Sequence, residues 1–200
     1  SKTYYKFKVS KDTLCRISQA ALQAAGLGNV NADHFQLWRN GEEVRLYSSV
    51  TNAPLGPSDY LEFFGRMNDG KPDNPLYRNT DFQLASKYSL ETDTASYFLT
   101  VNSTGNNLRY ITASNTAPSL TTPDAYFMRS LNHYYKSQIN KGEAKVVGEY
   151  VYSSSYDAGE GWASVTGYPC CDVIKEFFNL NVYTAGPANG LTVKVNAVGT

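Results

Sequence analysis

The predicted fold is decided by residues 35–65, which read FQLWRNGEEVRLYSSVTNAPLGPSDYLEFFG. Asn40-Gly41 separates two runs rich in apolar residues. This dipeptide is the strongest short-range signal for a β-hairpin, because both residues tolerate positive φ. A second break, NAPLGP at residues 52–57, leads into the strand-like run YLEFFG. The stretch therefore predicts β-sheet, and it contains no recognisable catalytic residue.

Similar short runs of apolar and β-branched residues, separated by turn signals, recur along the chain. Outside residues 35–65 they are 4–9, 13–18, 82–84, 88–90, 96–101, 108–111, 146–152, 173–180 and 191–198. One helix is predicted at residues 18–25, since Ser18 can cap it, alanines fill it and Gly26 can end it. Residues 124–135 fit either a helix or a strand. The sequence therefore predicts an all-β fold, a β-sandwich or jelly roll with one short helix.

Composition sets the broad class of protein. The 200 residues fit a single β-rich module, 1–200, with the best candidate for an internal boundary near residues 114–123. The net charge is zero and only 18% of residues are charged, so the sequence predicts no nucleic-acid partner. No apolar run approaches the ~20 residues of a membrane span. The tyrosine-rich, weakly charged composition is typical of secreted and cell-surface modules, and the abrupt start on a strand-like run suggests a processed or cloned fragment.

Catalysis is not predicted from the titratable residues. The candidates for a nucleophile, its base or a pair of glycosidase acids are Cys15, Cys170, Cys171, His34, His133, Glu62, Glu149 and Glu160. None of the cysteines lies in a glycine-rich elbow, and nothing in the sequence brings two of the acids into one cleft. Three cysteines do not make a disulfide framework. We expect three buried free thiols, and the alternative is one bridge from Cys15 to Cys170 or Cys171.

One polar loop carries several hard oxygen ligands. They belong to Asn68, Asp69, Asp73, Asn74 and Asp81. Calcium prefers such ligands, but the spacing misses the EF-hand pattern, and the same residue types build ordinary turns. We favour an ordinary turn and keep a calcium site at Asp69, Asp73 and Asp81 as the alternative. No other cofactor is expected.

Carbohydrate binding is the remaining site hypothesis, because sugars stack on exposed aromatic rings. The candidates are Tyr134, Tyr135, Tyr150, Tyr152, Tyr156 and Trp162, of which Tyr150, Tyr152 and Trp162 are preferred. Aromatic residues at strand spacing are more often core or cross-strand pairs. For Trp162, which follows Gly159-Glu160-Gly161, we favour a structural anchor whose indole N–H finds a partner.

Five segments, in order, resemble the gingipain-type cysteine peptidase family, to which the type IX secretion sortase belongs. They are YYKFKVSKDTLCRISQAALQAAGL (4–27), FQLWRNGEEVRL (35–46), DYLEFFGRMNDG (59–70), YSLETDTASYFLTV (88–101) and GEGWASV (159–165). The resemblance implies a non-catalytic N-terminal β-domain that precedes a peptidase domain. The family's catalytic His and Cys blocks have no match here, so no catalytic role carries over. Ala163 departs from the aromatic residue that the family often has after the tryptophan.

The sequence thus predicts a non-catalytic interaction module from a secreted or cell-surface bacterial protein. Its expected partner is a downstream domain of the same polypeptide, against which it packs or which it orients. A carbohydrate-binding or adhesion module is the alternative. An enzyme in its own right is the third reading.

Overall fold

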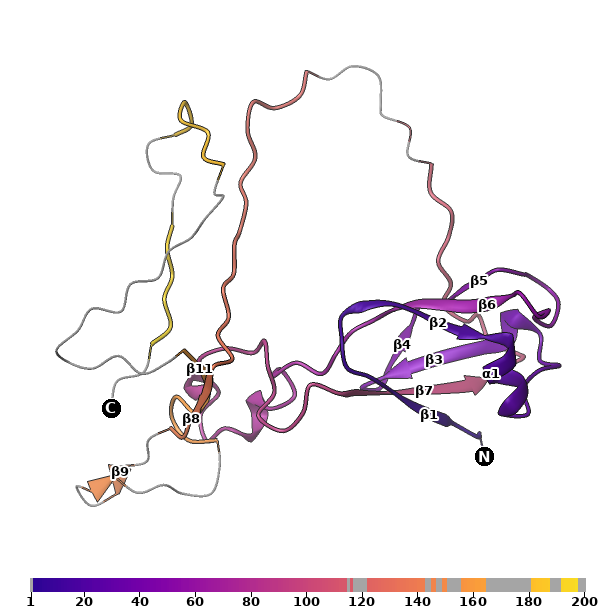
Figure 1. Ribbon diagram of the computed structural model, residues 1–200, viewed down its shortest axis with the longest axis horizontal. Helices are drawn as coiled ribbons and strands as arrows, with labels where there is room; N and C mark the ends of the chain where they lie inside the picture. Colours follow the sequence, from indigo (N-terminus) through magenta and orange to yellow (C-terminus); the bar gives the residue numbers. More distant parts are fainter. Residues whose placement is uncertain are drawn as a thin grey trace. The chain divides into compact units, whose positions relative to one another are not determined.

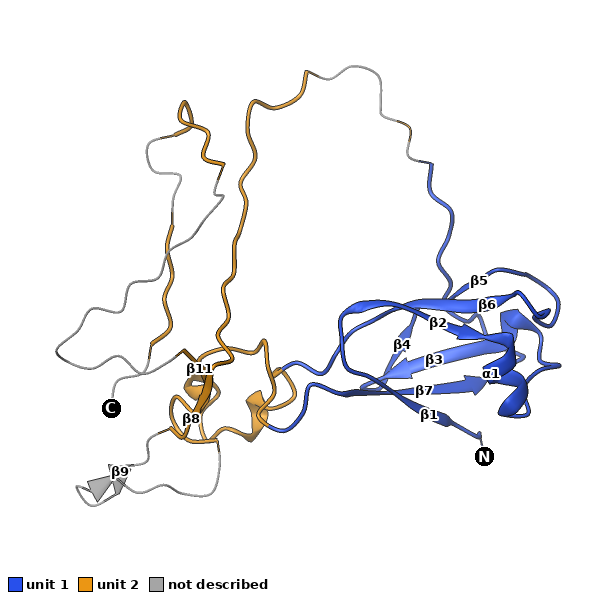
Figure 2. Cartoon of the chain, viewed as in Figure 1, with its two compact units in different colours: residues 1–69, 91–115 blue, residues 70–90, 116–200 orange. Residues whose placement is uncertain are grey.

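The computed structural model describes residues 2–114, 116, 122–142, 145–146, 149–150, 156–164, 181–187 and 192–197, with backbone alone at 145–146 and 149–150 (Figure 1). The chain groups into two compact units (Figure 2). Unit 1 comprises Ser1–Asp69 and Glu91–Asn115, and unit 2 comprises Gly70–Leu90 and Thr116–Thr200. The expectation that residues 1–200 form a single module stays a prediction.

Unit 1 is built from two antiparallel sheets. The four-stranded sheet has the order β1 (Tyr5–Val9), β7 (Ala95–Val101), β3 (Phe35–Arg39) and β4 (Glu42–Val44). The three-stranded sheet has the order β2 (Thr13–Ser18), β6 (Tyr60–Gly65) and β5 (Tyr47–Ser48). These strands, with one short α-helix among the residues that the structure describes, confirm the predicted all-β fold.

The two sheets share one hydrophobic core. Along β6, Leu61 and Phe63 are fully buried, because alternate residues of a strand point to the same side. The Phe63 ring lies 5.8 Å from the ring of Phe7 on β1 and 5.3 Å from that of Tyr97 on β7, measured between centroids. Edge-to-face and tilted contacts at such distances are favourable for aromatic pairs. Phe63 therefore joins the inner faces of both sheets.

The helix α1 (Gln19–Ala24) forms where the sequence predicts it. The Ser18 hydroxyl accepts a hydrogen bond from the Ala21 N–H at 3.3 Å and so satisfies one of the unpaired donors of the first turn. Gly26 follows the helix with a φ of +78°, which ends it in the left-handed conformation. Of the helix's own residues only Leu22 is buried, so this one side chain anchors the helix to the core.

The predicted hairpin at Asn40-Gly41 is confirmed. Asn40 and Gly41 have φ values of +49° and +78°, and Arg39 pairs with Glu42 across the two-residue loop between β3 and β4. Two consecutive positive φ angles are the mark of a type I′ turn, whose twist matches that of the flanking strands.

Gly41→Val should lower the free energy of unfolding by roughly 1 kcal/mol or more, since a β-branched residue is strongly disfavoured at positive φ. A Cβ at this position would meet no atom within 4 Å, so the cost comes from the backbone conformation alone. Urea denaturation measures it. Gly41→Asn is the matched control, because asparagine tolerates this conformation, and equal stabilities of the two variants would contradict the prediction.

An arginine ties a loop of unit 1 to the start of β3 and to the residues just before it. Arg109 Nη2 donates toward the backbone carbonyl oxygens of Ala32, Asp33 and Phe35 at 3.2, 2.8 and 2.7 Å. Burial lowers the pKa of the Arg109 guanidinium, while the nearby carboxylates of Asp33 and Glu43 raise it. The predicted strand at 108–111 is wrong: within it the structure has a single bridge, between Arg109 and Leu46. The Arg109 side chain and the Glu43 carboxylate, which accepts from Leu108 N–H, add further attachments.

Unit 2 contains short elements. They are the 3-10 helices η2 (Asn74–Leu76) and η3 (Thr80–Phe82) and the antiparallel pairs of β8 (Gln138–Asn140) with β11 (Gly161–Ala163) and β9 (Lys145–Val146) with β10 (Glu149–Tyr150). The strands predicted at 82–84 and 88–90 are wrong. The Asn79 side chain caps η3 by accepting from Asp81 N–H, and the Asp73 carboxylate accepts from Leu90 N–H at the place where a strand would need a neighbouring carbonyl.

Other predicted elements of this unit also differ. Residues 124–135 are neither helix nor strand, and residues 192–197 pair with no strand among those described. The run 173–180 lies outside the described residues. A search of the described part of the chain finds no helix long and apolar enough to cross a membrane.

Candidate functional site

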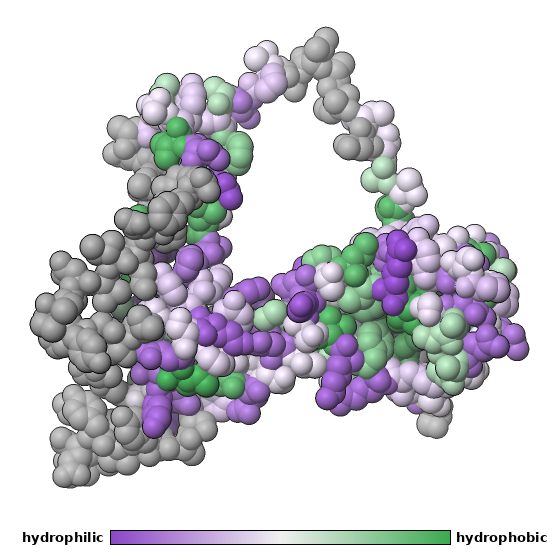
Figure 3. All heavy atoms as spheres, viewed as in Figure 1, coloured by the Kyte–Doolittle hydropathy of each residue, from purple (hydrophilic) through white to green (hydrophobic). Residues whose placement is uncertain are grey.

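The side of the three-stranded sheet that points away from the hydrophobic core carries the best candidate site, which we call the outer face. It consists of Leu14 and Arg16 on β2, Tyr47 on β5, and Tyr60, Glu62 and Phe64 on β6. These positions alternate with the inward-pointing residues of the same strands. Because the inner face of the sheet is packed on the core, the register of the outward side chains is fixed. In the view of Figure 3, hydrophobic residues are visible on the surface of unit 1 among hydrophilic ones.

Leu14 and Phe64 form the apolar part of the outer face. They are direct cross-strand partners in the β2–β6 ladder. Leu14 is 58% exposed and Phe64 is 45% exposed. An exposed aliphatic and an exposed aromatic side chain at neighbouring positions make a local apolar surface, which is more informative than a single exposed residue.

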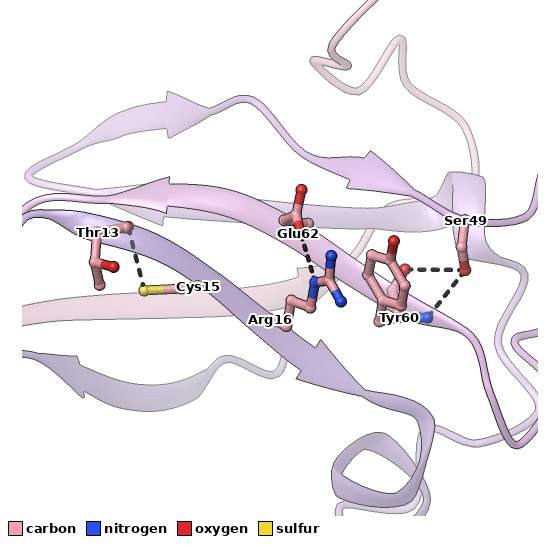
Figure 4. A network of polar contacts seen from close by, with 6 residues as sticks. All are labelled: Thr13, Cys15, Arg16, Ser49, Tyr60 and Glu62. Carbon is pink, nitrogen blue, oxygen red and sulfur yellow. Dashed lines mark hydrogen bonds and ion pairs between the residues drawn. The ribbon is translucent and has the colours of Figure 1, made fainter.

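Arg16 and Glu62, the next outward pair of the same ladder, form its charged part. The Arg16 Nε donates to Glu62 Oε2 at 2.5 Å (Figure 4). The same guanidinium lies 4.0 Å from the centre of the Tyr60 ring, within the range of a cation–π contact. The hydrogen bond to Glu62 is the main reason that the pKa of Arg16 is raised above its usual value. The arginine is therefore held in one place although its side chain is exposed.

The two tyrosines of the outer face do not form a flat platform. Their ring centres are 6.3 Å apart, and the ring planes are tilted by 43°. The backbone at Tyr60 is held by Ser49, whose hydroxyl accepts from the Tyr60 N–H at 3.0 Å (Figure 4). The same hydroxyl donates to the Asp59 carboxylate at 2.8 Å. The backbone that carries the Tyr60 ring is thus ordered.

Of the aromatic residues predicted to bind sugars, Trp162 is the best described. It lies on β11 and is half-buried, and its Nε1 donates to the Ser89 carbonyl oxygen at 3.0 Å. The Lys136 ammonium lies 4.9 Å from the centre of the indole ring. Tyr150 belongs to β10, where the structure describes the backbone alone, and Tyr152 lies outside the described residues.

The remaining aromatic candidates differ in exposure and in the residues that they contact. Tyr134 is exposed, and Tyr135 lies 4.7 Å from His133. Tyr156 has a φ of +64° and makes an edge-to-face contact with Tyr77 at 5.2 Å. The pKa of Tyr77 is raised to about 12, mainly by burial and secondly by the negative charge of Glu160. The Tyr77 hydroxyl donates to the Glu160 carbonyl oxygen at 2.7 Å. Tyr77 and Tyr156 therefore act together as packing residues of unit 2.

The proposed calcium ligands have separate surroundings. Asp73 is buried, and its two carboxylate oxygens accept from Ser89 Oγ at 3.1 Å and Leu90 N at 2.9 Å. Asp81 is exposed in η3, and Asp69 belongs to unit 1. Within the described residues, no three His, Cys, Asp or Glu side chains gather closely enough to hold a metal ion. Calcium binding at these residues stays a prediction.

The candidate catalytic residues likewise have other contacts. Cys15 is a half-buried free thiol whose Sγ donates to Thr13 O at 3.6 Å, while Cys170 and Cys171 lie outside the described residues. Glu62 pairs with Arg16, and Glu160 accepts from the Asp157 N–H. His34 lies in the 3-10 helix η1 (Ala32–His34), His133 lies beside Tyr135, and for Glu149 only the backbone is described.

Sequence reasoning missed the apolar half of the outer face. One signal was present: in a strand that alternates, consecutive Phe63 and Phe64 cannot both point inward, so one of them must face outward. Fold and site together define an all-β module with an exposed face of mixed apolar, aromatic and charged character. No protein-family model, curated protein or solved structure matches this chain.

Proposed function

We propose that this chain is a non-catalytic interaction module whose outer face packs against a folded protein domain. The observation that carries the proposal is the exposed cross-strand pair of Leu14 and Phe64. Burying such side chains against a partner removes apolar area from water, which favours association. An exposed apolar pair bordered by polar groups is typical of a protein contact surface.

The polar residues of the outer face support the same function. Tyrosine and arginine are enriched at the centres of protein interfaces, and this face presents Tyr47, Tyr60 and Arg16 together. Because Glu62 and Tyr60 already hold the arginine, little side-chain freedom is lost when a partner covers it. Charge at such a position contributes to the orientation of the partner.

The partner that we propose is a downstream domain of the same polypeptide, in a secreted or cell-surface bacterial protein. The ordered sequence resemblance to gingipain-type peptidases supports this assignment. The absence of matching catalytic blocks supports a role outside catalysis.

Two features of the tyrosine rings argue against a carbohydrate on the outer face. Flat stacking of a sugar needs an open ring face, and the 43° tilt between Tyr47 and Tyr60 prevents one sugar chain from lying flat on both rings. In addition, the Arg16 guanidinium covers one face of Tyr60. A protein surface, which adapts to a tilted and partly charged face, fits better.

A photo-crosslinking experiment tests the proposal. The photoreactive residue p-benzoylphenylalanine replaces Phe64 in the full-length natural polypeptide, and cross-linked peptides are identified by mass spectrometry. We expect cross-links from position 64 to a segment of the polypeptide outside residues 1–200, and we expect Leu14→Ser to reduce their yield. The matched control places the same photoreactive residue at Lys8, an exposed position of β1 in the other sheet.

Equal cross-linking from positions 64 and 8 would contradict the proposal, as would cross-links confined to residues 1–200. Binding of an oligosaccharide that is lost in Tyr47→Ala, with no protein cross-link from position 64, would replace it with the carbohydrate alternative.

A further inference from the structure

Unit 2 contains two aromatic rings that share one cation. The Lys136 ammonium lies 4.9 Å from the ring centre of Tyr88 and 4.9 Å from that of Trp162. Both distances are within the roughly 6 Å over which a ring face attracts a cation. The nitrogen thus contacts a phenol and an indole that come from segments 74 residues apart in the sequence.

The two rings are connected by hydrogen bonds that do not involve the lysine. Trp162 Nε1 donates to the carbonyl oxygen of Ser89, the residue that follows Tyr88. Ser89 is buried, and its hydroxyl donates to the buried carboxylate of Asp73 at 3.1 Å, while the Leu90 N–H donates to the same carboxylate at 2.9 Å. A buried polar network of this kind fixes the groups that it joins. The segments that carry the two rings should therefore keep their positions when the lysine side chain moves away.

The lysine itself is attached by its backbone neighbours. Ser137 N–H donates to Ala163 O at 3.1 Å, which extends the β8–β11 ladder in which Ile139 pairs with Trp162. Lys136 is exposed overall, and its long side chain is not itself part of that ladder. Lys136 and the two rings that it contacts are therefore held by different sets of hydrogen bonds.

We propose that Tyr88 and Trp162 form a binding site for alkylammonium groups, which Lys136 occupies in the absence of a ligand. Recognition of quaternary and methylated ammonium by aromatic rings is the established use of this chemistry in proteins. A methylated ammonium carries its charge on a larger apolar surface than a primary one and is less strongly hydrated, so it competes effectively with the lysine for the two ring faces. This site lies in unit 2 and is independent of the outer face of unit 1.

The test uses tetramethylammonium chloride as the probe and Trp162 fluorescence as the signal. Trp38 is the second tryptophan, and Trp38→Phe isolates the signal of Trp162. Because the Trp38 Nε1 is buried without a hydrogen-bond partner, this replacement removes no stabilising bond. We expect a saturable change in emission on titration, measured against sodium chloride at equal ionic strength and against neutral tert-butanol.

Removing the tethered competitor should strengthen binding of the probe. In Lys136→Ala, in the Trp38→Phe background, we expect the midpoint to fall by about two- to fivefold, which corresponds to the modest strength of an exposed cation–π contact. Tyr88→Phe, which keeps the ring, should retain the response, whereas Tyr88→Leu should abolish it. Far-UV circular dichroism checks that each variant is folded.

Three outcomes would overturn the proposal. The first is a linear or absent fluorescence response to tetramethylammonium both with lysine and with alanine at position 136. The second is an equal titration midpoint for these two proteins, and the third is an equal fluorescence response to tert-butanol. Tyr88→Phe and Lys136→Ala suffice for the decision if Tyr88→Leu does not fold.

Discussion

Phe63→Ala should lower the free energy of unfolding of unit 1 by about 3–5 kcal/mol, the usual cost of truncating a fully buried phenylalanine. Phe63 has no exposed surface, and its ring contacts Phe7 and Tyr97 of the opposite sheet. Alanine would remove both ring contacts and leave a cavity between two sheets whose hydrogen-bonded strands cannot easily move together. Urea denaturation followed by Trp38 fluorescence, with Trp162→Phe to isolate that signal, measures the change.

The adjacent residue supplies the matched control. Phe64 is the same residue type on the same strand but points to the outer face, where it is 45% exposed. Phe64→Ala should therefore cost less than about 1 kcal/mol, as expected for a surface position. Equal losses for Phe63→Ala and Phe64→Ala would show that the register of β6 is wrong.

Arg109→Ala should lower the free energy of unfolding by about 2–4 kcal/mol. The guanidinium donates to three backbone carbonyl oxygens at residues 32, 33 and 35, and hydrogen bonds from a charged donor are worth more than neutral ones. Without the arginine, these partly buried acceptors lose their common donor, and the loop that carries Arg109 loses its attachment to the start of β3. The same denaturation experiment measures the effect.

Arg45 is the control for Arg109. It donates from an exposed position to a single carbonyl oxygen, that of Arg109 itself, at 3.0 Å. Arg45→Ala should change the free energy of unfolding by no more than about 1 kcal/mol. Arg109→Lys should give an intermediate loss, because an ammonium keeps the charge but lacks the planar fork of donors. A stability of Arg109→Ala indistinguishable from that of Arg45→Ala would contradict the proposed attachment.

Much of unit 1 could be predicted from the sequence because its signals are local. Thr13–Ser18 and Tyr60–Gly65 have the predicted bounds, and the hairpin at Asn40-Gly41 forms with both predicted positive φ angles. In each case the residue pattern and the final fold favour the same conformation. Such agreement between local preference and tertiary packing is what makes a strand recognisable from its own residues.

Unit 2 was predicted less well because side chains distant in sequence control its backbone. Residues 88–90 have a β-like composition, yet Asp73 accepts from both Ser89 and Leu90, and the Ser89 carbonyl accepts from Trp162. These bonds take the place of a strand ladder. They depend on partners 16 to 73 residues away, which a window of local sequence does not contain.

The candidate sites divide in the same way. The aromatic character of Trp162 and the need of its N–H for a hydrogen-bond acceptor follow from the indole itself, and the acceptor is the Ser89 carbonyl oxygen. That a lysine would occupy one ring face could not be predicted, because Lys136 is brought there by the pairing of β8 with β11. The apolar part of the outer face was missed for a related reason: Leu14 and Phe64 become neighbours only through the pairing of β2 with β6.

Local sequence is enough to predict most strands of unit 1, its turn at Asn40-Gly41 and the start of its helix, whereas the strand predicted at 108–111 does not form. These features depend on φ preferences, capping and alternation, which act over a few residues. Only the tertiary structure decided that Phe63 is buried while Phe64 is exposed, and that Tyr88, Lys136 and Trp162 meet. The physical reason is that burial and side-chain contact depend on which strands become neighbours, and pairing between distant segments is set by the packing of the whole unit.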